Sequence, residues 1–348
     1  MPSPKNRVIF AAAGSGKTTE LVNEALALAS SRILFTTYTL ENLWQIREKF
    51  TRHAGSVPTN VALRSWYSFL LQDLVRPYQR SLTARPRVRS INFRDLPDEA
   101  RFAKKATQKD RYYLTASGRI HRDRVSEFAT EANAATKAAV MRRLERIYDY
   151  VFIDELQDLV GYDLEVLDAL FSSTISVSCV GDPRQFTYST NRSTKNKAFR
   201  GPELLRWLEQ TPRCHNIALQ TRVVSHRCNA AICEFADGLF PAMPTTIAGN
   251  TTPSGHDGIF RIPRTAVEEY VQDHAPMILR HDRKTDTCGL AAMNFGASKG
   301  QTFDHVLIFP TGPMKRYLKS GDPTTAGDLA RFYVAVTRAK HSVAFVVD

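Results

Sequence analysis

The sequence lacks an apolar run long enough to cross a membrane, and its first ten residues, MPSPKNRVIF, have no apolar core like that of a signal peptide. Cysteine is scarce: there are five, an odd number, and no two are spaced as Cys-x-x-Cys. These absences argue against a disulfide framework, a cysteine-rich zinc site and a membrane partner. We therefore expect a soluble protein of the reducing cytoplasm.

Acidic residues are too few to balance the basic ones. The chain has 47 lysine and arginine residues against 35 aspartate and glutamate residues, a formal net charge of +12. This surplus favours a polyanionic partner, nucleic acid first, although a basic but inert surface is the alternative. The length of 348 residues, 43% of them hydrophobic, is sufficient for two domains with real cores.

Short β-rich runs alternate with helical patterns, which predicts an α/β fold with parallel sheets. In the first half we expect strands at residues 8–12, 32–37, 150–154 and 175–181. A second set is expected at residues 216–220, 258–262, 276–280, 291–295, 305–309 and 342–347. Two sheets, one in each half, fit this pattern better than one very wide sheet. A helix over 201–209 followed by Pro212 predicts the join near 210–215, and hence domains 1–212 and 213–348.

Residues 76–146 interrupt the first half with a basic segment that contains proline. Within it, Ala116-Ser117-Gly118 predicts the turn of a hairpin. A run of basic charge is typical of a solvated face, but the neighbouring Tyr112 and Tyr113 leave a nucleic-acid surface open. We expect this segment to form a small accessory insertion in the first domain.

Residues 8–19, VIFAAAGSGKTT, read as a strand, a glycine-containing turn and the start of a helix, which is the order found in a phosphate-binding loop. Small residues let successive backbone N–H groups curl around an anion, and the helix aims its positive end at the same phosphates. Lys17 adds a charge for the β- and γ-phosphates, and the Thr18 hydroxyl is a ligand for Mg²⁺. One departure is Ala11, where the first glycine is usual. The predicted nucleotide-binding residues are Ala11, Ala12, Ala13, Gly14, Ser15, Gly16, Lys17, Thr18 and Thr19.

Two acids, Asp154 and Glu155, follow the apolar run of residues 150–153. Acids at a strand end are costly unless they meet a cation, and beside a phosphate loop that cation is Mg²⁺, held mainly by Asp154. Glu155 then lies where a general base polarises a water toward the γ-phosphate. A helix N-terminus carrying favourable acids is the alternative, but it does not account for the phosphate loop upstream.

The run of residues 154–158, DELQD, resembles motif II of superfamily 1 helicases of the UvrD/Rep/PcrA type, and other motifs of that family occur in the same order. They are residues 35–39 (FTTYT, motif Ia), 65–69 (SWYSF), 180–188 (VGDPRQFTY, motif III), 225–232 (SHRCNAAI, motif IV), 295–303 (FGASKGQTF, motif V) and 333–340 (YVAVTRAK, motif VI). The resemblance covers nearly the whole chain. It implies two RecA-like domains with ATP and Mg²⁺ in the cleft between them.

The resemblance also implies roles for single residues around the nucleotide. Gln185 would sense the γ-phosphate, and Arg227 and Arg338 would reach it as arginine fingers. Arg222 is a rival for Arg227, because both follow the same predicted strand. Gly300 would bring the backbone of motif V close to the nucleotide and the strand. Cations in these places fit the chemistry, since phosphoryl transfer depends on positioning and charge stabilisation.

Five residues are implied in nucleic-acid binding. Tyr38 and Tyr188 occupy positions where relatives stack aromatic rings on bases. Thr39, Ser65 and Trp66 would contact the backbone or the bases nearby. For each aromatic ring, packing in the core is the alternative.

The sequence departs from the family pattern in four places. No glutamine precedes the phosphate loop in residues 1–7, which leaves adenine selectivity open. Thr190 stands where relatives often have tryptophan, and Thr302 replaces an acidic residue used on the ribose. Residues 237–293, between motifs IV and V, are too few for the subdomain that large helicases insert there.

The resemblance implies an ATP-dependent DNA helicase that translocates on single-stranded DNA, in the 3′ to 5′ direction. Its partners would be single-stranded or tailed duplex DNA, and a nuclease or another replication or repair protein. The alternative is an NTP-driven regulatory switch that binds nucleic acid or a protein partner without unwinding. Stimulation of the ATPase by single-stranded DNA distinguishes the two.

Overall fold

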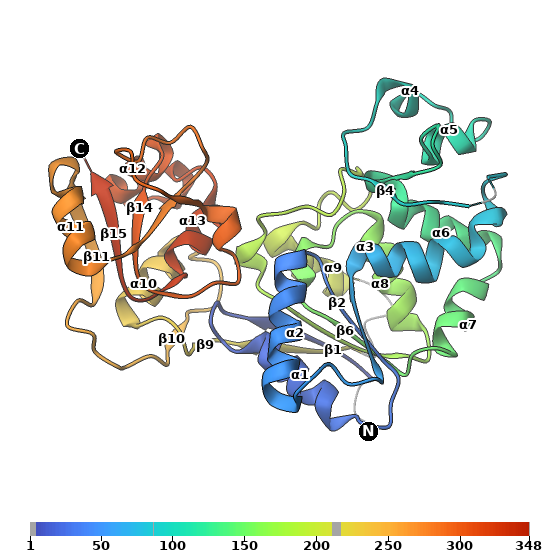
Figure 1. Ribbon diagram of the computed structural model, residues 1–348, viewed down its shortest axis with the longest axis horizontal. Coiled ribbons are helices and arrows are strands. Elements are labelled where there is room, and N and C mark those ends of the chain that lie inside the picture. The colour runs from blue at the N-terminus through green and yellow to red at the C-terminus, as the bar shows by residue number, and fades with distance from the viewer. Residues whose placement is uncertain (1–4, 86, 211–216, 348) are drawn as a thin grey trace. The chain divides into compact units, whose positions relative to one another are not determined.

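The computed structural model describes residues 5–85, 87–210 and 217–347 (Figure 1). The chain divides into two compact units. Unit 1 consists of Met1–Ile9, Thr18–Gly181 and Tyr188–Gln220, and unit 2 of Phe10–Lys17, Asp182–Thr187 and Thr221–Asp348. Of the join predicted near residues 210–215, only Gln210 lies within the described residues.

Unit 1 is organised on a six-stranded sheet with the order β3-β2-β6-β7-β1-β8. Its strands are β1 (Asn6–Ala11), β2 (Ile33–Thr37), β3 (Val61–Ser65), β6 (Tyr150–Ile153), β7 (Ser176–Gly181) and β8 (Ile217–Arg222). The pairs β2–β3, β2–β6 and β6–β7 are parallel. Because β2 and β6 are covered on both faces, they read as continuous apolar runs, and this is why the sequence predicts them.

Two strands of this sheet differ from the prediction. The edge strand β3 was missed, because its sequence VALRS is only partly buried and carries a weak apolar signal. The strand predicted at 216–220 was assigned to the second sheet, but β8 belongs to the first, next to β1. A strand pattern records which residues are buried and not which sheet the strand joins, so the pairing of β8 was undetermined by sequence.

The helices that surround the unit 1 sheet are α1 (Lys17–Ala27), α2 (Leu40–Ala54), α8 (Tyr162–Ser172) and α9 (Leu204–Gln210). Helix α2 is capped at its N-terminus by Thr39, whose side chain accepts a hydrogen bond from the Asn42 N–H, and at its C-terminus by Gly55 with φ 78°. Both ends therefore follow the usual capping chemistry, with a hydroxyl at the start and a left-handed glycine at the end.

The accessory segment of unit 1 is mainly helical. It follows α3 (Trp66–Phe69) and contains α4 (Asp98–Arg101), α5 (Lys109–Tyr113), α6 (Val125–Ala135), α7 (Ala139–Glu145) and a parallel pair of short strands, β4 (Ile91–Asn92) and β5 (Ile120–His121). The predicted hairpin turn is present: Leu114 and Ile120 form an antiparallel bridge around Gly118, which has φ 76°. Tyr113 is fully buried and its hydroxyl donates to Glu131, so the structure corrects its proposed surface role.

Unit 2 is organised on a five-stranded parallel sheet with the order β11-β15-β14-β12-β13. Its strands are β11 (Gly258–Pro263), β12 (Met277–Arg280), β13 (Met293–Asn294), β14 (Phe303–Phe309) and β15 (Ala339–Val347), and β9 (Val224–Ser225) pairs separately with β10 (Ile247–Ala248). Its helices are α10 (Ala230–Gly238), α11 (Val267–His274), α12 (Gly312–Ser320) and α13 (Leu329–Val336).

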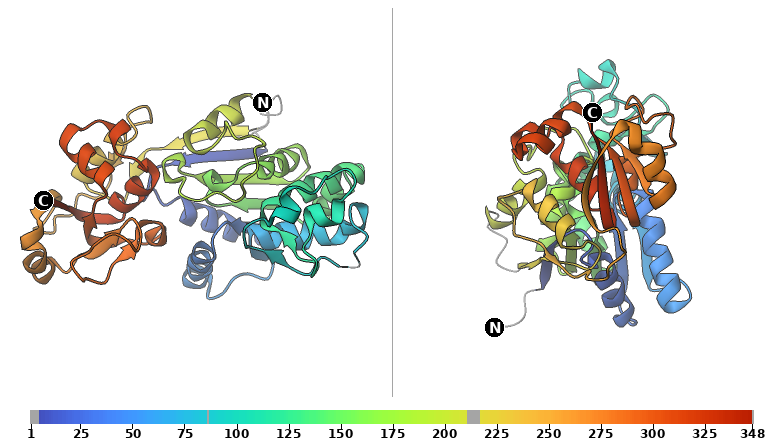
Figure 2. Two further views of the ribbon diagram at one scale, coloured as in Figure 1. Left: turned by 90° about the horizontal axis from the view of Figure 1, so that it is seen from above. Right: turned by 90° about the vertical axis from the view of Figure 1, so that its left-hand side faces the viewer.

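The two faces of this sheet have separate cores. Alternating residues of β14 divide between them: Val306 and Ile308 pack with α10, α12 and α13, whereas Leu307 and Phe309 pack with α11. Figure 2 shows the same arrangement, with α11 in orange on one side of the strands and α12 and α13 in red on the other. A sheet with helices on both faces is the α/β architecture that the sequence predicts. Among the described residues, no helix is long and apolar enough to cross a membrane.

Four histidines of unit 2 lie close together. His256 precedes β11 and stacks on His274 of α11 with ring centroids 3.7 Å apart. His256 lies 5.6 Å from His305 of β14, which in turn lies 6.0 Å from His341 of β15. Burial, followed by the neighbouring histidines, lowers the pKa of both His256 and His305, although Asp257 and Asp304 oppose the shift.

We expect this cluster to make unit 2 less stable in mild acid. A lowered folded-state pKa means that the unfolded chain binds more protons near the ordinary histidine pKa, so stability is lost as the pH falls through that range. Calorimetry should give a lower melting temperature at about pH 5.5 than at about pH 7.5. The double variant His256→Gln, His305→Gln should show a smaller difference, and an unchanged difference would contradict this assignment.

Candidate functional site

The phosphate loop has the backbone that anion binding needs. β1 ends at Ala11 and α1 begins at Lys17, so the strand, loop and helix occur as expected. Gly14 and Gly16 have φ angles of 77° and 81°, a left-handed conformation that glycine adopts without strain. Between them, the Ser15 hydroxyl is buried and has no hydrogen-bond partner among the described residues. A nest of N–H groups with an unsatisfied hydroxyl fits the phosphates of a nucleotide.

Gly14 is also required by a close approach within unit 2. A Cβ atom at this position would lie 2.5 Å from the Cβ of Arg227 and 2.8 Å from the Ser225 hydroxyl. The His226 N–H donates to the Gly14 carbonyl at 3.0 Å. The segment that resembles motif IV therefore packs directly against the loop, which the sequence predicts only through the resemblance.

Thr18 and Asp154 form the expected oxygen pair in unit 1. The Thr18 hydroxyl donates to Asp154 Oδ2 at 2.9 Å, and Asp154 Oδ1 accepts from the Glu155 N–H at 3.0 Å. Asp154 is buried where β6 ends. Among the described residues no cluster of three or more histidine, cysteine, aspartate or glutamate side chains is suited to a metal. A Mg²⁺ ion at Thr18 and Asp154 would take most of its ligands from phosphate and water, as Mg²⁺ commonly does.

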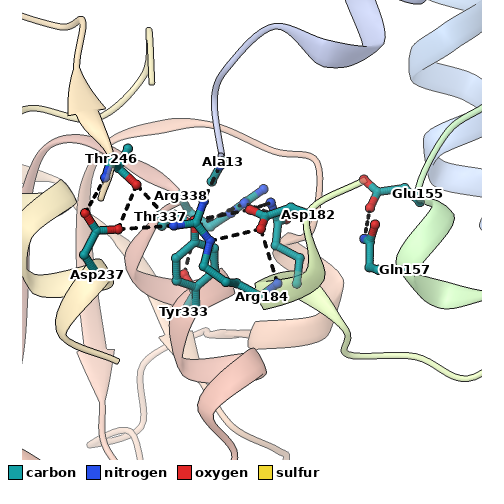
Figure 3. Close-up of polar contacts among 11 residues, drawn as sticks. Ala13, Glu155, Gln157, Asp182, Arg184, Asp237, Thr246, Tyr333, Thr337 and Arg338 are labelled. Carbon is teal, nitrogen blue, oxygen red and sulfur yellow. Dashed lines mark hydrogen bonds and ion pairs between the residues drawn. The ribbon is translucent and has the colours of Figure 1, made fainter. Parts of the chain in front are cut away.

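Glu155 is held in an unusual conformation. Its φ and ψ angles are 59° and 45°, in the left-handed region, where a residue with a Cβ atom is strained by about 1–3 kcal/mol. Its side chain is buried and accepts a hydrogen bond from Gln157 Nε2 (Figure 3). Strain of this kind clusters at active sites, so the conformation supports a functional role for this carboxylate.

In unit 2, two of the predicted catalytic residues are in contact. Arg338 is 1% exposed, and its Nη2 donates to Gln185 Oε1 at 3.3 Å. The rest of the guanidinium donates to the carbonyls of Val334 and Gln301 at 2.9 and 3.3 Å. Gln185 is itself buried, and its Nε2 donates to Asp182 Oδ2 at 2.9 Å. The segments that resemble motifs III and VI are therefore linked through side chains.

Sequence reasoning missed a buried cluster around Arg184. Its Nε donates to Asp182 Oδ1 at 3.0 Å, its Nη1 to Asp237 Oδ1 at 3.2 Å, and its guanidinium lies 4.9 Å from the centroid of the Tyr333 ring (Figure 3). The Tyr333 hydroxyl donates to Asp182 Oδ2 at 3.2 Å. Burial disfavours the charged form of Arg184, but Asp182 and the other partners outweigh it and raise its pKa. Asp182, like Asp154, follows an apolar strand, and that signal could have identified it.

The remaining predicted nucleotide contacts also lie in unit 2. Arg227 is half-buried, and its Nη1 donates to the Thr337 carbonyl at 2.8 Å. Its rival Arg222 is exposed at the end of β8, and its carbonyl accepts from the Ala12 N–H at 2.9 Å. Gly300 has φ 85°, a left-handed conformation that favours glycine. The choice of Arg227 over Arg222 as an arginine finger stays a prediction.

The predicted nucleic-acid residues divide into two groups in unit 1. Tyr38 is half-buried and Tyr188 is 36% exposed, and their ring centroids lie 6.3 Å apart. Thr39 and Ser65 remain half-exposed and cap the N-termini of α2 and α3. Trp66 differs: it is 1% exposed and its Nε1 donates to Asp163 Oδ1 at 2.7 Å. Its burial argues against the predicted contact with nucleic acid and makes it a core residue.

Comparison with known proteins supports a helicase fold. The family model for the UvrD/REP helicase N-terminal domain matches residues 101–199. No curated protein sequence matches the chain. Arterivirus nonstructural protein 10, a helicase, is similar in structure, with 17% identity, a TM-score of 0.52, and coverage of 99% of this chain and 60% of the other. The same viral helicase in complex with DNA gives 16% identity, a TM-score of 0.51, and coverage of 99% and 61%.

The chain thus spans about three fifths of the length of these viral helicases. At this identity the likeness shows the fold alone, namely mixed α/β units with parallel sheets. The match over residues 101–199 includes the runs that resemble motifs II and III.

Proposed function

We propose that this chain is an ATP-dependent superfamily 1 DNA helicase of the UvrD/Rep/PcrA type that translocates on single-stranded DNA, in the 3′ to 5′ direction. The observation that carries the proposal is the hydrogen bond between Thr18, directly after the phosphate-loop lysine, and Asp154 at the end of β6. This pairing is what a Mg²⁺-dependent phosphate loop needs. The family match and the helicase neighbours, one of them in complex with DNA, support the choice of nucleic acid as partner.

The roles of the residues follow from phosphoryl-transfer chemistry. Mg²⁺ supplies charge neutralisation on the phosphates of ATP. The backbone of Gly14–Gly16 and the Lys17 ammonium bind and orient those phosphates. The Glu155 carboxylate accepts the proton of the attacking water. Arg338 and Arg227 stabilise the negative charge that develops during transfer.

We propose that Gln185 couples ATP hydrolysis to nucleic-acid binding. It contacts Arg338, and only two residues separate it in sequence from Tyr188. A shift of Gln185 on hydrolysis would therefore move the short segment that carries Tyr188. We propose that this coupling changes the grip on the strand between the nucleotide states.

The decisive experiment measures ATP hydrolysis with and without single-stranded DNA, and strand displacement on duplexes with a 3′ or a 5′ tail. We expect strong stimulation by single-stranded DNA and displacement only from the 3′ tail. Hydrolysis that is indifferent to DNA would contradict the proposal and favour a regulatory switch. Displacement from the 5′ tail alone would overturn the polarity and leave the motor assignment intact.

We further expect the isolated chain to unwind short duplexes only. Residues 237–293 hold the end of α10, β10, β11, α11 and β12, with no room for a large inserted subdomain. Each base-pair step must be melted against about 1.4 kcal/mol of stacking, and a surface must hold the junction meanwhile. We propose that a nuclease or another replication or repair protein supplies that surface. Displacement of long duplexes by the isolated chain would exclude this requirement.

A further inference from the structure

Four aromatic rings form a continuous row in unit 1. Tyr188 lies 6.3 Å from Tyr38, Tyr38 lies 5.8 Å from Tyr67, and Tyr67 lies 5.2 Å from Phe93, measured between ring centroids. This aromatic row begins at the last residue of the motif III segment, passes the ends of β2 and β3, and finishes in the accessory segment just after β4. Sequence reasoning identified Tyr38 and Tyr188 and missed Phe93.

Burial separates the members of the aromatic row. Tyr67 is 7% exposed, and its hydroxyl donates to the Thr190 carbonyl, so it is a fixed support. Phe93 is 58% exposed and meets the Tyr67 ring at an interplanar angle of 85°. An edge-to-face contact with a buried ring orients Phe93 while most of its own surface faces solvent. A large apolar ring held in this way is suited to stacking against a ligand.

The charge around Phe93 indicates the ligand. Residues 76–146 contain 18 arginine and lysine residues against 8 aspartate and glutamate residues, which accounts for ten of the twelve net positive charges of the chain. Arg89 and Arg94 flank Phe93 in the sequence and are exposed. Arg122 acts electrostatically on both Tyr38 and Tyr67. Basic residues interleaved with exposed aromatic rings are typical of single-strand binding surfaces.

We propose that Phe93 stacks on a base of single-stranded nucleic acid, so that the strand runs from Tyr188 and Tyr38 onto the accessory segment. The inference rests on the proposed function and assigns a base-binding position that the family motifs do not include. Because Tyr38 and Phe93 both contact Tyr67, their centroids are at most 11 Å apart. That span matches about three bases stacked at roughly 3.4 Å each. The same strand can therefore contact both rings.

The alternative is that the exposed Phe93 ring forms part of a docking site for a protein partner. The surplus of ten positive charges in residues 76–146 favours a polyanion, because lysine and arginine side chains neutralise the phosphates of a nucleic acid. Unchanged affinity of Phe93→Ala for single-stranded DNA would favour protein docking and overturn the proposal.

The test compares Phe93→Ala, Phe93→Trp and the control Phe102→Ala. Phe102 is 76% exposed in the same segment but lies outside the aromatic row. Fluorescence anisotropy with oligothymidylate should show affinity reduced about 5- to 100-fold by Phe93→Ala, since stacking on one base has that worth. Phe93→Trp should retain or strengthen binding. Phe102→Ala should leave both the affinity and the DNA-free ATPase rate unchanged.

A second measurement locates the contact directly. Oligonucleotides that carry 5-iodouridine at single positions should cross-link to the peptide containing Phe93 from one position and to that containing Tyr188 from another. If the unmodified chain binds single-stranded DNA but Phe93→Ala binds equally well, the inference is wrong and the proposed function stands. If the unmodified chain does not bind single-stranded DNA, both the inference and the proposed function are wrong. Loss of affinity in Phe102→Ala equal to that in Phe93→Ala would also overturn the inference, because it would indicate a general surface.

Discussion

Arg338→Ala is expected to lower the rate of ATP hydrolysis by about 10³- to 10⁵-fold, the range in which an arginine finger acts. The guanidinium is buried in unit 2 and its Nη2 reaches Gln185 Oε1, so it is already oriented by fixed partners. An oriented cation in a buried site stabilises developing charge without reorganisation, which is why its removal affects turnover so strongly. Arg338→Lys should also be nearly inactive, because a lysine cannot reproduce the planar fork.

Arg338 also donates to the Val334 and Gln301 carbonyls, so Arg338→Ala could be inactive simply because it is misfolded. This explanation must be excluded. The melting temperature of each variant shows whether it is folded. Arg331→Ala, on helix α13 just before Arg338 and paired with the surface residue Asp328, is the matched control and should hydrolyse ATP normally. Lys17→Ala and Glu155→Gln should be as inactive as Arg338→Ala. A folded Arg338→Ala protein with an ATPase rate near that of the unmodified chain would refute the assignment.

Asp163→Ala is expected to lower the free energy of unfolding of unit 1 by about 3–5 kcal/mol, because several buried donors lose their acceptor at about 1–3 kcal/mol each. The Asp163 carboxylate is fully buried in α8. It accepts hydrogen bonds from Trp66 Nε1, Ser126 Oγ, Thr190 Oγ1 and Asn191 Nδ2. Burial raises its pKa, and the hydrogen bonds from the hydroxyl and indole groups oppose that shift. One carboxylate thus joins α3, α6, α8 and the segment after Tyr188.

Urea unfolding at neutral pH measures this loss. Glu165→Ala, on the same helix, removes a partly exposed partner of Lys195 and should change stability by less than about 1 kcal/mol. Trp66→Phe, which removes one donor and leaves a smaller aromatic ring in its place, should fall between the two. Because Thr190 lies two residues after Tyr188, we also expect Asp163→Ala to weaken single-stranded DNA binding at temperatures where it remains folded. Equal stability of the Asp163→Ala and Glu165→Ala proteins would show that the carboxylate is not the centre of this cluster.

The sequence by itself determined those features of the candidate site that depend on residues close together in the chain. The phosphate loop needs a strand, two left-handed glycines and a helix start in succession, and residues 6–17 provide them in that order. Asp154 follows the apolar run of β6, so the Thr18–Asp154 pair was predictable from local pattern and parallel-sheet geometry. The central strands β2 and β6 were predictable as well, because their burial leaves apolar runs in the sequence.

The tertiary structure alone decided which aromatic and charged side chains are available. Trp66 and Tyr113 look like surface candidates, yet both are buried, and their polar atoms donate hydrogen bonds to Asp163 and Glu131 on other elements. Arg184 is buried because three separate segments supply Asp182, Asp237 and Tyr333. Phe93 gained its orientation from Tyr67 in the same way. Burial and orientation depend on partners that the fold brings together, and a periodic pattern along one segment contains no information about those partners.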